Sequence, residues 1–222
     1  MTSFLGMKGD KVPGTLPASF YERESTAVAK DLLGKILLVR SQVRRPLESP
    51  RALVTAGRIV ETEAYRGSDP ASHSCRGRTP RSALLFGPPG LAYVYFIYGN
   101  YEMLNCVAEP DGLAGAVLIR AVSPLFGEAL MERRRGGLPR TRWTDGPGKL
   151  CRAMGVKMAH KGQTFAGPAL YVTDDGFRPD KAMTSPRVGI SAGRSAYWRY
   201  FIAGDPFVSR APEDSQARPL KW

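Results

Sequence analysis

The segment from Ala52 to Tyr65 constrains the fold more than any other, because it predicts one long strand with charged residues inside it. Its second half reads RIVETEAY, and successive side chains of a strand point to opposite faces of a sheet. The odd-numbered side chains are expected on one face: Ile59, Glu61, Glu63 and Tyr65. The even-numbered ones are expected on the other: Val60, Thr62 and Ala64. The pattern predicts a sheet with two carboxylates close together on one face.

A second strand-like run, from Tyr93 to Ala108, predicts a hairpin that turns near Gly99-Asn100. A two-residue turn would pair Tyr95 with Leu104. A three-residue loop, Gly99 to Tyr101, would pair Tyr95 with Asn105 on one face. We expect the longer loop, because it places the amide of Asn105, a polar residue in an apolar run, where it can find partners.

The remaining segments predict an α+β fold. A helix starting near Ala27 ends at Gly34, and another covers 127–135. The segment DGPGKLCRAMG predicts a glycine turn that opens a third helix. Further strands are expected at KILLVR, Gly115–Val122, ALYVT, RVGI and WRYFIA. We expect a flexible arm over residues 1–14 and a single domain over 15–222. This domain has a curved, mainly antiparallel sheet, surrounding helices and a protruding β-hairpin.

Charge indicates the kind of partner. The chain carries 32 Lys and Arg against 20 Asp and Glu, a net charge of +12, which attracts polyanions. No apolar run approaches the roughly 18 residues of a membrane span, so no membrane partner is expected. Cys75, Cys106 and Cys151 are too few and too far apart for a disulfide framework, which favours an intracellular location.

Carboxylates beside aromatic residues on a basic chain favour chemistry on a nucleic acid. A carboxylate in a partly apolar site can act as a general base on water. The strand pattern alone does not choose between Glu61 and Glu63, and either could instead pair with an arginine. His73, one of two histidines, can stack on a base, and Tyr98 at the hairpin tip can wedge between base pairs.

These residues lie in blocks that resemble the alkyladenine (3-methyladenine) DNA glycosylase family. The blocks are RIVETEAYRG, ASHS, YVYFIYGNYEMLNCV, VLIRAVSP, GPGKLCRAMG and RVGI. The resemblance extends from FYERESTAVAKDLLGKILL to WRYFIAGDPFVS, nearly the whole chain. Family members flip a damaged purine out of duplex DNA and hydrolyse its N-glycosidic bond without cutting the strand.

The resemblance implies a role for each matching position. Glu63 corresponds to the base that activates water, with Arg120 and the Val188 carbonyl completing the water site. Tyr65 and His73 would stack on one face of the flipped base and Tyr95 on the other. Asn105 would sit against the base edge and help reject guanine. Tyr98 would fill the gap left in the duplex.

The resemblance also implies a monomer that needs no metal or other cofactor and acts on double-stranded DNA containing damaged purines. Lys149, in GPGK, is expected to contact the DNA backbone, although a plain helix start is the alternative. Asn100 and Glu102 depart from the family pattern. The main rival function is a non-catalytic basic nucleic-acid-binding module. A zinc deaminase is not supported, since its H-x-E and P-C-x-x-C motifs are missing.

Overall fold

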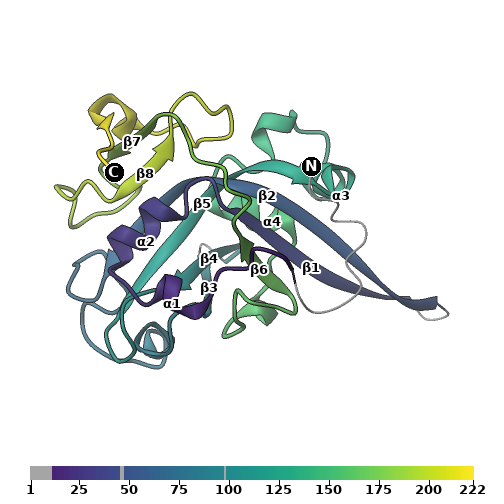
Figure 1. Cartoon of the computed structure of the whole chain (residues 1–222), viewed down its shortest axis with the longest axis horizontal. Helices are drawn as coiled ribbons and strands as arrows, with labels where there is room; N and C mark the ends of the chain where they lie inside the picture. The colour runs from purple at the N-terminus through teal and green to yellow at the C-terminus, as the bar shows by residue number, and fades with distance from the viewer. Residues whose placement is uncertain (1–11, 46–47, 98) are drawn as a thin grey trace.

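The long strand forms the centre of the molecule in a computed structural model that describes residues 12–45, 48–97 and 99–222. This strand, β2 (Glu48–Arg66), pairs with β1 (Ile36–Arg45) over its first half. Its second half pairs with β5 (Gly115–Phe126) on one edge and with β8 (Arg199–Ile202) on the other. Figure 1 shows β2 and β5 running side by side through the body. The carboxylate segment is thus held between two neighbouring strands.

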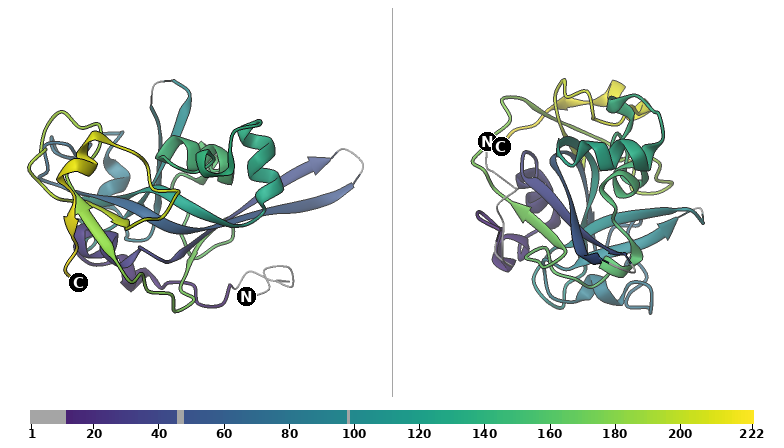
Figure 2. Two further views of the ribbon diagram at one scale, coloured as in Figure 1. Left: turned by 90° about the horizontal axis from the view of Figure 1, so that it is seen from above. Right: turned by 90° about the vertical axis from the view of Figure 1, so that its right-hand side faces the viewer.

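The described strands join into one antiparallel sheet of nine strands, in the order β3-β4-β5-β2-β8-β7-β9, with β1 and β6 branching from β2. The remaining strands are β3 (Ala92–Ile97), β4 (Tyr101–Val107), β6 (Leu170–Thr173), β7 (Ala182–Ser185) and β9 (Arg218–Pro219). The β3–β4 hairpin projects from the body (left panel of Figure 2). The predicted α+β class, antiparallel sheet and protruding hairpin are confirmed.

Helices cover the sheet and share one core with it. They are α1 (Ala18–Tyr21), α2 (Ser25–Asp31), α3 (Glu128–Arg135) and α4 (Pro147–Met154). Short 3-10 turns lie at Ala83–Phe86, Arg140–Arg142, Met158–His160 and Pro212–Gln216. Val28, Met131 and Leu150 bring α2, α3 and α4 into the same buried cluster as Leu104 of β4. The hairpin base is therefore anchored in the main core.

Most predicted elements are confirmed, and one is wrong. The first predicted helix is α2, and Gly34 follows it with a left-handed φ of 86°. RVGI, expected to be a strand, forms a turn instead, and the strand lies earlier, at β7. Two features explain the turn: Pro186 precedes it, and Gly189 adopts a φ of 71° that favours glycine.

A bulge in β2 changes which residues share a face. The β2–β5 register shifts between Ile59 and Glu61 and again between Glu61 and Thr62. Ile59 therefore packs in the core cluster that holds Ala64, whereas Val60 packs against Phe207 in a separate cluster. The predicted faces are wrong for Ile59 and Val60, because a bulge inserts a residue that breaks the alternation.

Residues 1–11 of the predicted arm lie outside the described residues. Val12 is buried and packs with Ile36 and Leu38, and Gly14 bonds through its carbonyl to the N–H of Asp174. The chain is thus part of the packed fold from its first described residue.

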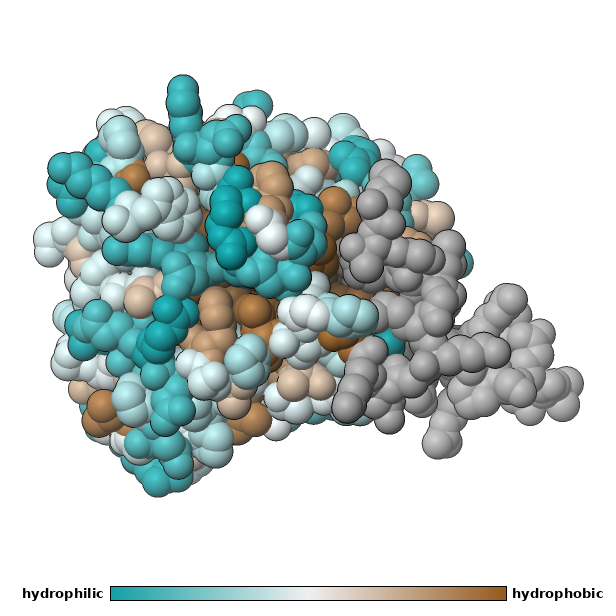
Figure 3. All heavy atoms as spheres, viewed as in Figure 1, coloured by the Kyte–Doolittle hydropathy of each residue, from teal (hydrophilic) through white to brown (hydrophobic). Residues whose placement is uncertain are grey.

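Hydrophilic side chains predominate on the face in Figure 3, with apolar residues showing mainly in patches between them. No helix in the described part of the chain is both long and apolar enough to cross a membrane.

Candidate active site

A cavity of about 490 Å³ lies beside the β3–β4 hairpin. This volume is within the range of about 300–1,000 Å³ common for small-molecule sites. Its wall combines segments that are far apart in sequence. Six residues selected from the sequence line it: Tyr65, His73, Tyr95, Asn105, Arg120 and Val188. The fold therefore brings most of the predicted site together.

The remaining selected residues lie elsewhere. Glu63 sits directly behind the wall, because its carboxylate bonds to three residues that line it. Tyr98 lies outside the described residues. Lys149 is absent from the cavity wall, and its ammonium pairs with Asp145 at 3.0 Å at the start of α4. Asp145 also pairs with Arg142, so two cations share one carboxylate and the Lys149 charge is only partly compensated in the free protein.

The hairpin register differs from both predicted alternatives. Ile97 pairs with Tyr101, so the loop has three residues but lies one position earlier than expected. Tyr95 consequently pairs with Met103, and Asn105 pairs with Tyr93. The predicted Tyr95–Asn105 pair is wrong by two residues. A shift of two keeps the same face of the strand, so Asn105 still faces the cavity with Tyr95.

Asn105 is buried, and its amide nitrogen donates to the Tyr93 carbonyl at 3.2 Å. The cross-strand contact fixes the side chain in place. The amide is therefore held rigidly at the cavity wall, where it can act as a fixed edge against a planar ligand.

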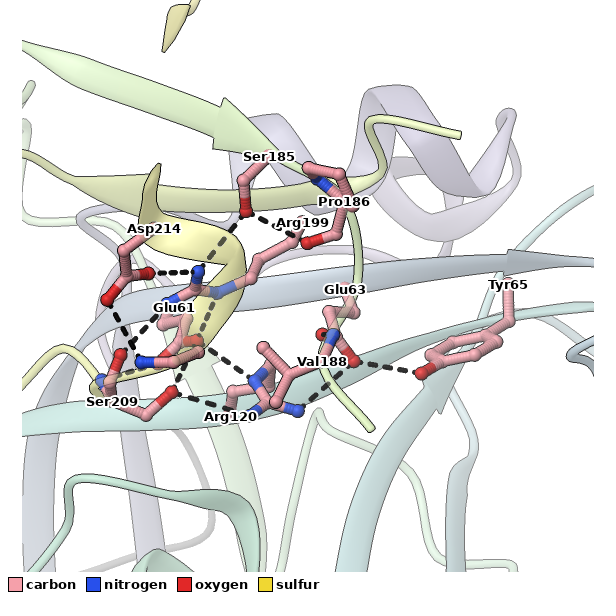
Figure 4. A network of polar contacts seen from close by, with 11 residues as sticks. Glu61, Glu63, Tyr65, Arg120, Ser185, Pro186, Val188, Arg199, Ser209 and Asp214 are labelled. Carbon is pink, nitrogen blue, oxygen red and sulfur yellow. Dashed lines mark hydrogen bonds and ion pairs between the residues drawn. The ribbon is translucent and has the colours of Figure 1, made fainter. Parts of the chain in front are cut away.

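Glu63 is fully buried and held by three groups of the cavity wall. Its Oε1 accepts a hydrogen bond from the Val188 N–H at 2.7 Å. Its Oε2 accepts from the Tyr65 hydroxyl at 2.8 Å and from Arg120 Nη1 at 3.2 Å (Figure 4). Burial, with the Glu63 charge, raises the pKa of Tyr65, so the hydroxyl keeps the proton that it donates. The Val188 contact is made by its N–H, and a role for its carbonyl stays a prediction.

Glu61 has a different environment, because only one of its partners, Arg120, lines the cavity. Its Oε1 accepts from Arg120 Nε at 2.9 Å, from Arg199 Nε at 2.6 Å and from the Ser209 hydroxyl at 2.7 Å. Its Oε2 accepts from the Ser209 N–H at 2.8 Å. Burial alone would raise the pKa of Glu61, but the two arginines and Ser209 outweigh it and lower the pKa. Glu61 is therefore a fixed anion within the structure.

Arg120 connects the two carboxylates. It contacts both Glu61 and Glu63, and it is itself 7% exposed at the cavity wall. Burial would lower the pKa of Arg120, but Glu63 and Glu61 raise it overall, so its charge is constant. Glu61 thus fixes the arginine that lies against Glu63.

Aromatic rings form one side of the cavity. The His73 and Tyr95 ring centroids are 4.6 Å apart with planes inclined by 72°, and Tyr93 lies 5.4 Å from Tyr95. His73 and Tyr95 were expected on opposite faces of a base, but here they touch edge to face. A base between them requires the two rings to separate.

Hydrogen bonds define the tautomer of His73. An Arg81 guanidinium nitrogen lies 3.2 Å from His73 Nε2, and arginine can only donate, so Nε2 is the acceptor. Nδ1 then carries the proton and donates to the Tyr93 hydroxyl at 2.9 Å. Burial, and next the Arg81 charge, lower the pKa of His73. The ring is therefore neutral at pH 7.

Replacing Arg81 by Gln is expected to raise the pKa of His73 toward its ordinary value, because a nearby positive charge is removed. Because folding lowers the pKa of His73 below its ordinary value of 6.5, the unfolded chain binds a proton at this ring more readily than the folded chain. The free energy of unfolding therefore falls as pH drops from neutral through 6.5 toward the folded-state pKa of His73. Titration of the His73 ring protons by NMR measures the change, with His160 as the internal control. An unchanged His73 pKa would contradict the assigned contact.

Sequence reasoning missed several buried polar residues near the site, among them Arg187, Arg199 and Ser209. Arg199 lies opposite Glu63 in the register of β2 and β8, and its side chain forms an ion pair with Glu61. A signal was present, since an arginine inside the apolar strand WRYFIA indicates a buried ionic partner. Within the described residues no group of three or more His, Cys, Asp or Glu side chains could hold a metal ion.

Comparison with known proteins identifies the family. The sequence model of methylpurine-DNA glycosylases matches residues 19–206. The chain belongs to the methylpurine-DNA glycosylase family. A relative from Chlorobaculum tepidum is 43% identical over 88% of this chain and 90% of its own length. One from Methanoculleus marisnigri is 42% identical over 88% of this chain and 99% of its own. Both bear the name "Putative 3-methyladenine DNA glycosylase". The glycosylase family assignment agrees with the resemblance seen in the sequence blocks.

Proposed function

We propose that this protein is a DNA repair glycosylase that flips alkylated or deaminated purines out of duplex DNA and hydrolyses their N-glycosidic bond. One observation carries the proposal: a buried carboxylate, Glu63, is held by three groups that line an aromatic cavity. That combination provides a platform for a flat base next to a group that can accept a proton from water. Family membership supports the same reaction class.

Base flipping explains the aromatic wall. A base inside a duplex is out of reach, and extruding it costs a few kcal/mol, less for a damaged base. Stacking on an aromatic side chain returns about 1–3 kcal/mol per base and tolerates varied ring chemistry. Burial raises the pKa of Tyr95 to about 12, so this ring stays neutral beside the base. In the proposal Tyr65, His73 and Tyr95 contact the base, Asn105 lies at its edge, and Tyr98 fills the gap in the duplex.

The hydrolysis uses Glu63 as general base. Water attacks the anomeric carbon, its proton passes to Glu63, and the purine leaves with the bonding electrons. The sugar develops oxocarbenium character, which a nearby carboxylate stabilises. Glu63 lies directly behind the cavity wall in the free protein, so the wall must open at one of its three contacts with Glu63 to admit the water. Arg120 keeps its charge throughout and orients the carboxylate.

The net charge of +12 provides sequence-independent attraction to DNA phosphates. Binding that rests on such contacts weakens steeply as salt rises. The reason is that the protein releases counterions from the DNA when it binds, and this release is less favourable at high salt. We propose that the protein acts as a monomer on double-stranded DNA, with Lys149 at the backbone. It leaves an abasic site and does not cleave the strand.

The test is release of free base. Duplexes carrying 3-methyladenine or hypoxanthine are incubated with the full chain, and the released base is quantified by chromatography. We expect free base from the lesion duplex, none from undamaged duplex, and strand breaks only after alkali treatment. A protein that binds these duplexes but releases no base would instead be the non-catalytic binding module.

A further inference from the structure

Arg187 is a buried arginine outside the Glu61–Arg120–Glu63 network. It is 1% exposed and does not line the cavity. Its Nη1 donates to the Ala64 carbonyl at 2.9 Å, and this carbonyl lies between Glu63 and Tyr65 on β2. Its guanidinium carbon is 4.6 Å from the centre of the Tyr65 ring. One side chain therefore contacts both the backbone and the ring that hold Glu63.

Asp69 fixes the guanidinium from the other side. Both Arg187 terminal nitrogens donate to the two Asp69 oxygens, and the Nη2–Oδ1 bond measures 2.9 Å. Asp69 Oδ1 also accepts from the Ala71 N–H at 3.1 Å, at the start of the loop that carries His73 to the cavity. Arg187 thus joins β2, this loop and its own turn.

The Arg187 turn supplies the third contact to Glu63. Val188 follows Arg187 directly, and its N–H is the donor to Glu63 Oε1. The position of that N–H therefore depends on where the Arg187 side chain is anchored. Three groups bind Glu63, and a single guanidinium determines the positions of two of them, Tyr65 and Val188.

The close packing around Arg187 leaves little freedom. A side-chain carbon at Gly193 would lie 2.8 Å from Asp69 Oδ1 and 2.9 Å from Arg187 Nη2. The Gly193 carbonyl also accepts from Nη2 at 3.3 Å. Arg187 Nε is buried and has no hydrogen-bond partner among the described residues, so the site is not optimised for stability alone. A buried ion pair is weak evidence for stability, and apolar residues often serve equally well there.

We propose that Arg187, held by Asp69, is a positioning residue for the Glu63 reaction: it aligns the Tyr65 ring and the Val188 N–H, and through them the carboxylate. The inference rests on the proposed glycosylase function. It places Arg187 outside the substrate site, acting through residues that touch the base and the water. Misplacing a reacting group by about 1 Å can cost about 100-fold in rate, so the effect falls on chemistry rather than on duplex binding.

Asp69→Asn tests this role, because it keeps the shape of the side chain while one of its two oxygens becomes a donor. Single-turnover base release is measured with enzyme in excess of a hypoxanthine duplex, together with affinity for undamaged duplex and the thermal midpoint. We expect the single-turnover rate to fall about 10- to 100-fold and affinity for undamaged duplex to stay within about twofold. Arg187→Lys keeps the charge but loses the planar fork, and a similar rate loss is expected.

A matched control is Asp174→Asn. Asp174 pairs at 2.7 Å with Lys35, which is 4% exposed, and neither residue lines the cavity. This variant should lower the thermal midpoint and leave the single-turnover rate of the folded protein unchanged. An Asp69→Asn rate equal to wild type, or an equal rate loss in both aspartate variants, overturns the proposal. If Asp69→Asn does not fold, Arg187→Lys decides alone by the same measurements. Absence of base release by the wild type would instead count against the proposed function.

Discussion

Glu63→Gln is expected to slow base release by about 10²- to 10⁴-fold, the usual contribution of a general base. The amide oxygen can still accept from the Val188 N–H, but the amide nitrogen then faces Arg120, which also donates. A glutamine cannot take the proton from water, so the chemical step loses its base. Binding to undamaged duplex should be unchanged, because Glu63 is fully buried and does not line the cavity. Single-turnover release and duplex affinity, measured side by side, check both parts.

The conservative variant Tyr65→Phe serves as the control for this experiment. It removes one hydrogen bond to Glu63 Oε2 and keeps both the ring and the carboxylate. Its rate should lie between wild type and Glu63→Gln. Glu63→Gln activity within tenfold of wild type would falsify the assignment of Glu63 as the base.

The sequence predicted the long strand, the hairpin and the face on which Asn105 lies, because local alternation specifies these features. It did not predict the hairpin register. The three-residue loop was expected, but β4 also pairs with β5, with Asn105 opposite Leu118, and this non-local pairing helps to fix the register. The β2 bulge was also missed, since it appears only where Glu61 meets Ala121 of a distant strand.

The local sequence pattern cannot decide between Glu61 and Glu63 as the general base. Both are buried glutamates on one face, and periodicity treats them alike. Their difference comes from their partners, most of which are distant in sequence. Arg199 and Ser209 donate hydrogen bonds to Glu61, whereas Tyr65 and Val188 hold Glu63 beside the cavity. The family resemblance selected Glu63 from its position in the ETEAY block, and the contacts of Glu63 with the cavity wall support that choice.

Glu61→Gln is expected to lower the free energy of unfolding by about 3–5 kcal/mol at pH 7, the usual cost of removing one partner from a buried ion pair. Arg120 and Arg199 both lose a negative partner, and Arg199 is fully buried. With its oxygen toward the arginines, the amide nitrogen of glutamine would also face the Ser209 N–H, which can only donate. Base release should weaken as well, because Arg120 is then less firmly fixed beside Glu63. Urea unfolding, followed by circular dichroism, measures the stability change.

The pH dependence separates this charge effect from a packing effect. Folding lowers the pKa of Glu61 from its ordinary value of 4.5, so its stabilisation is complete above that value. It is lost as pH falls through the lower folded-state pKa. The stability difference between wild type and Glu61→Gln should therefore be constant from pH 8 to about 5 and shrink in more acidic solution. Glu128→Gln is the control, since Glu128 is 42% exposed in its pair with Arg140, and such surface pairs contribute about 0–1 kcal/mol. A loss no larger in Glu61→Gln than in Glu128→Gln would show that the buried network contributes little to stability.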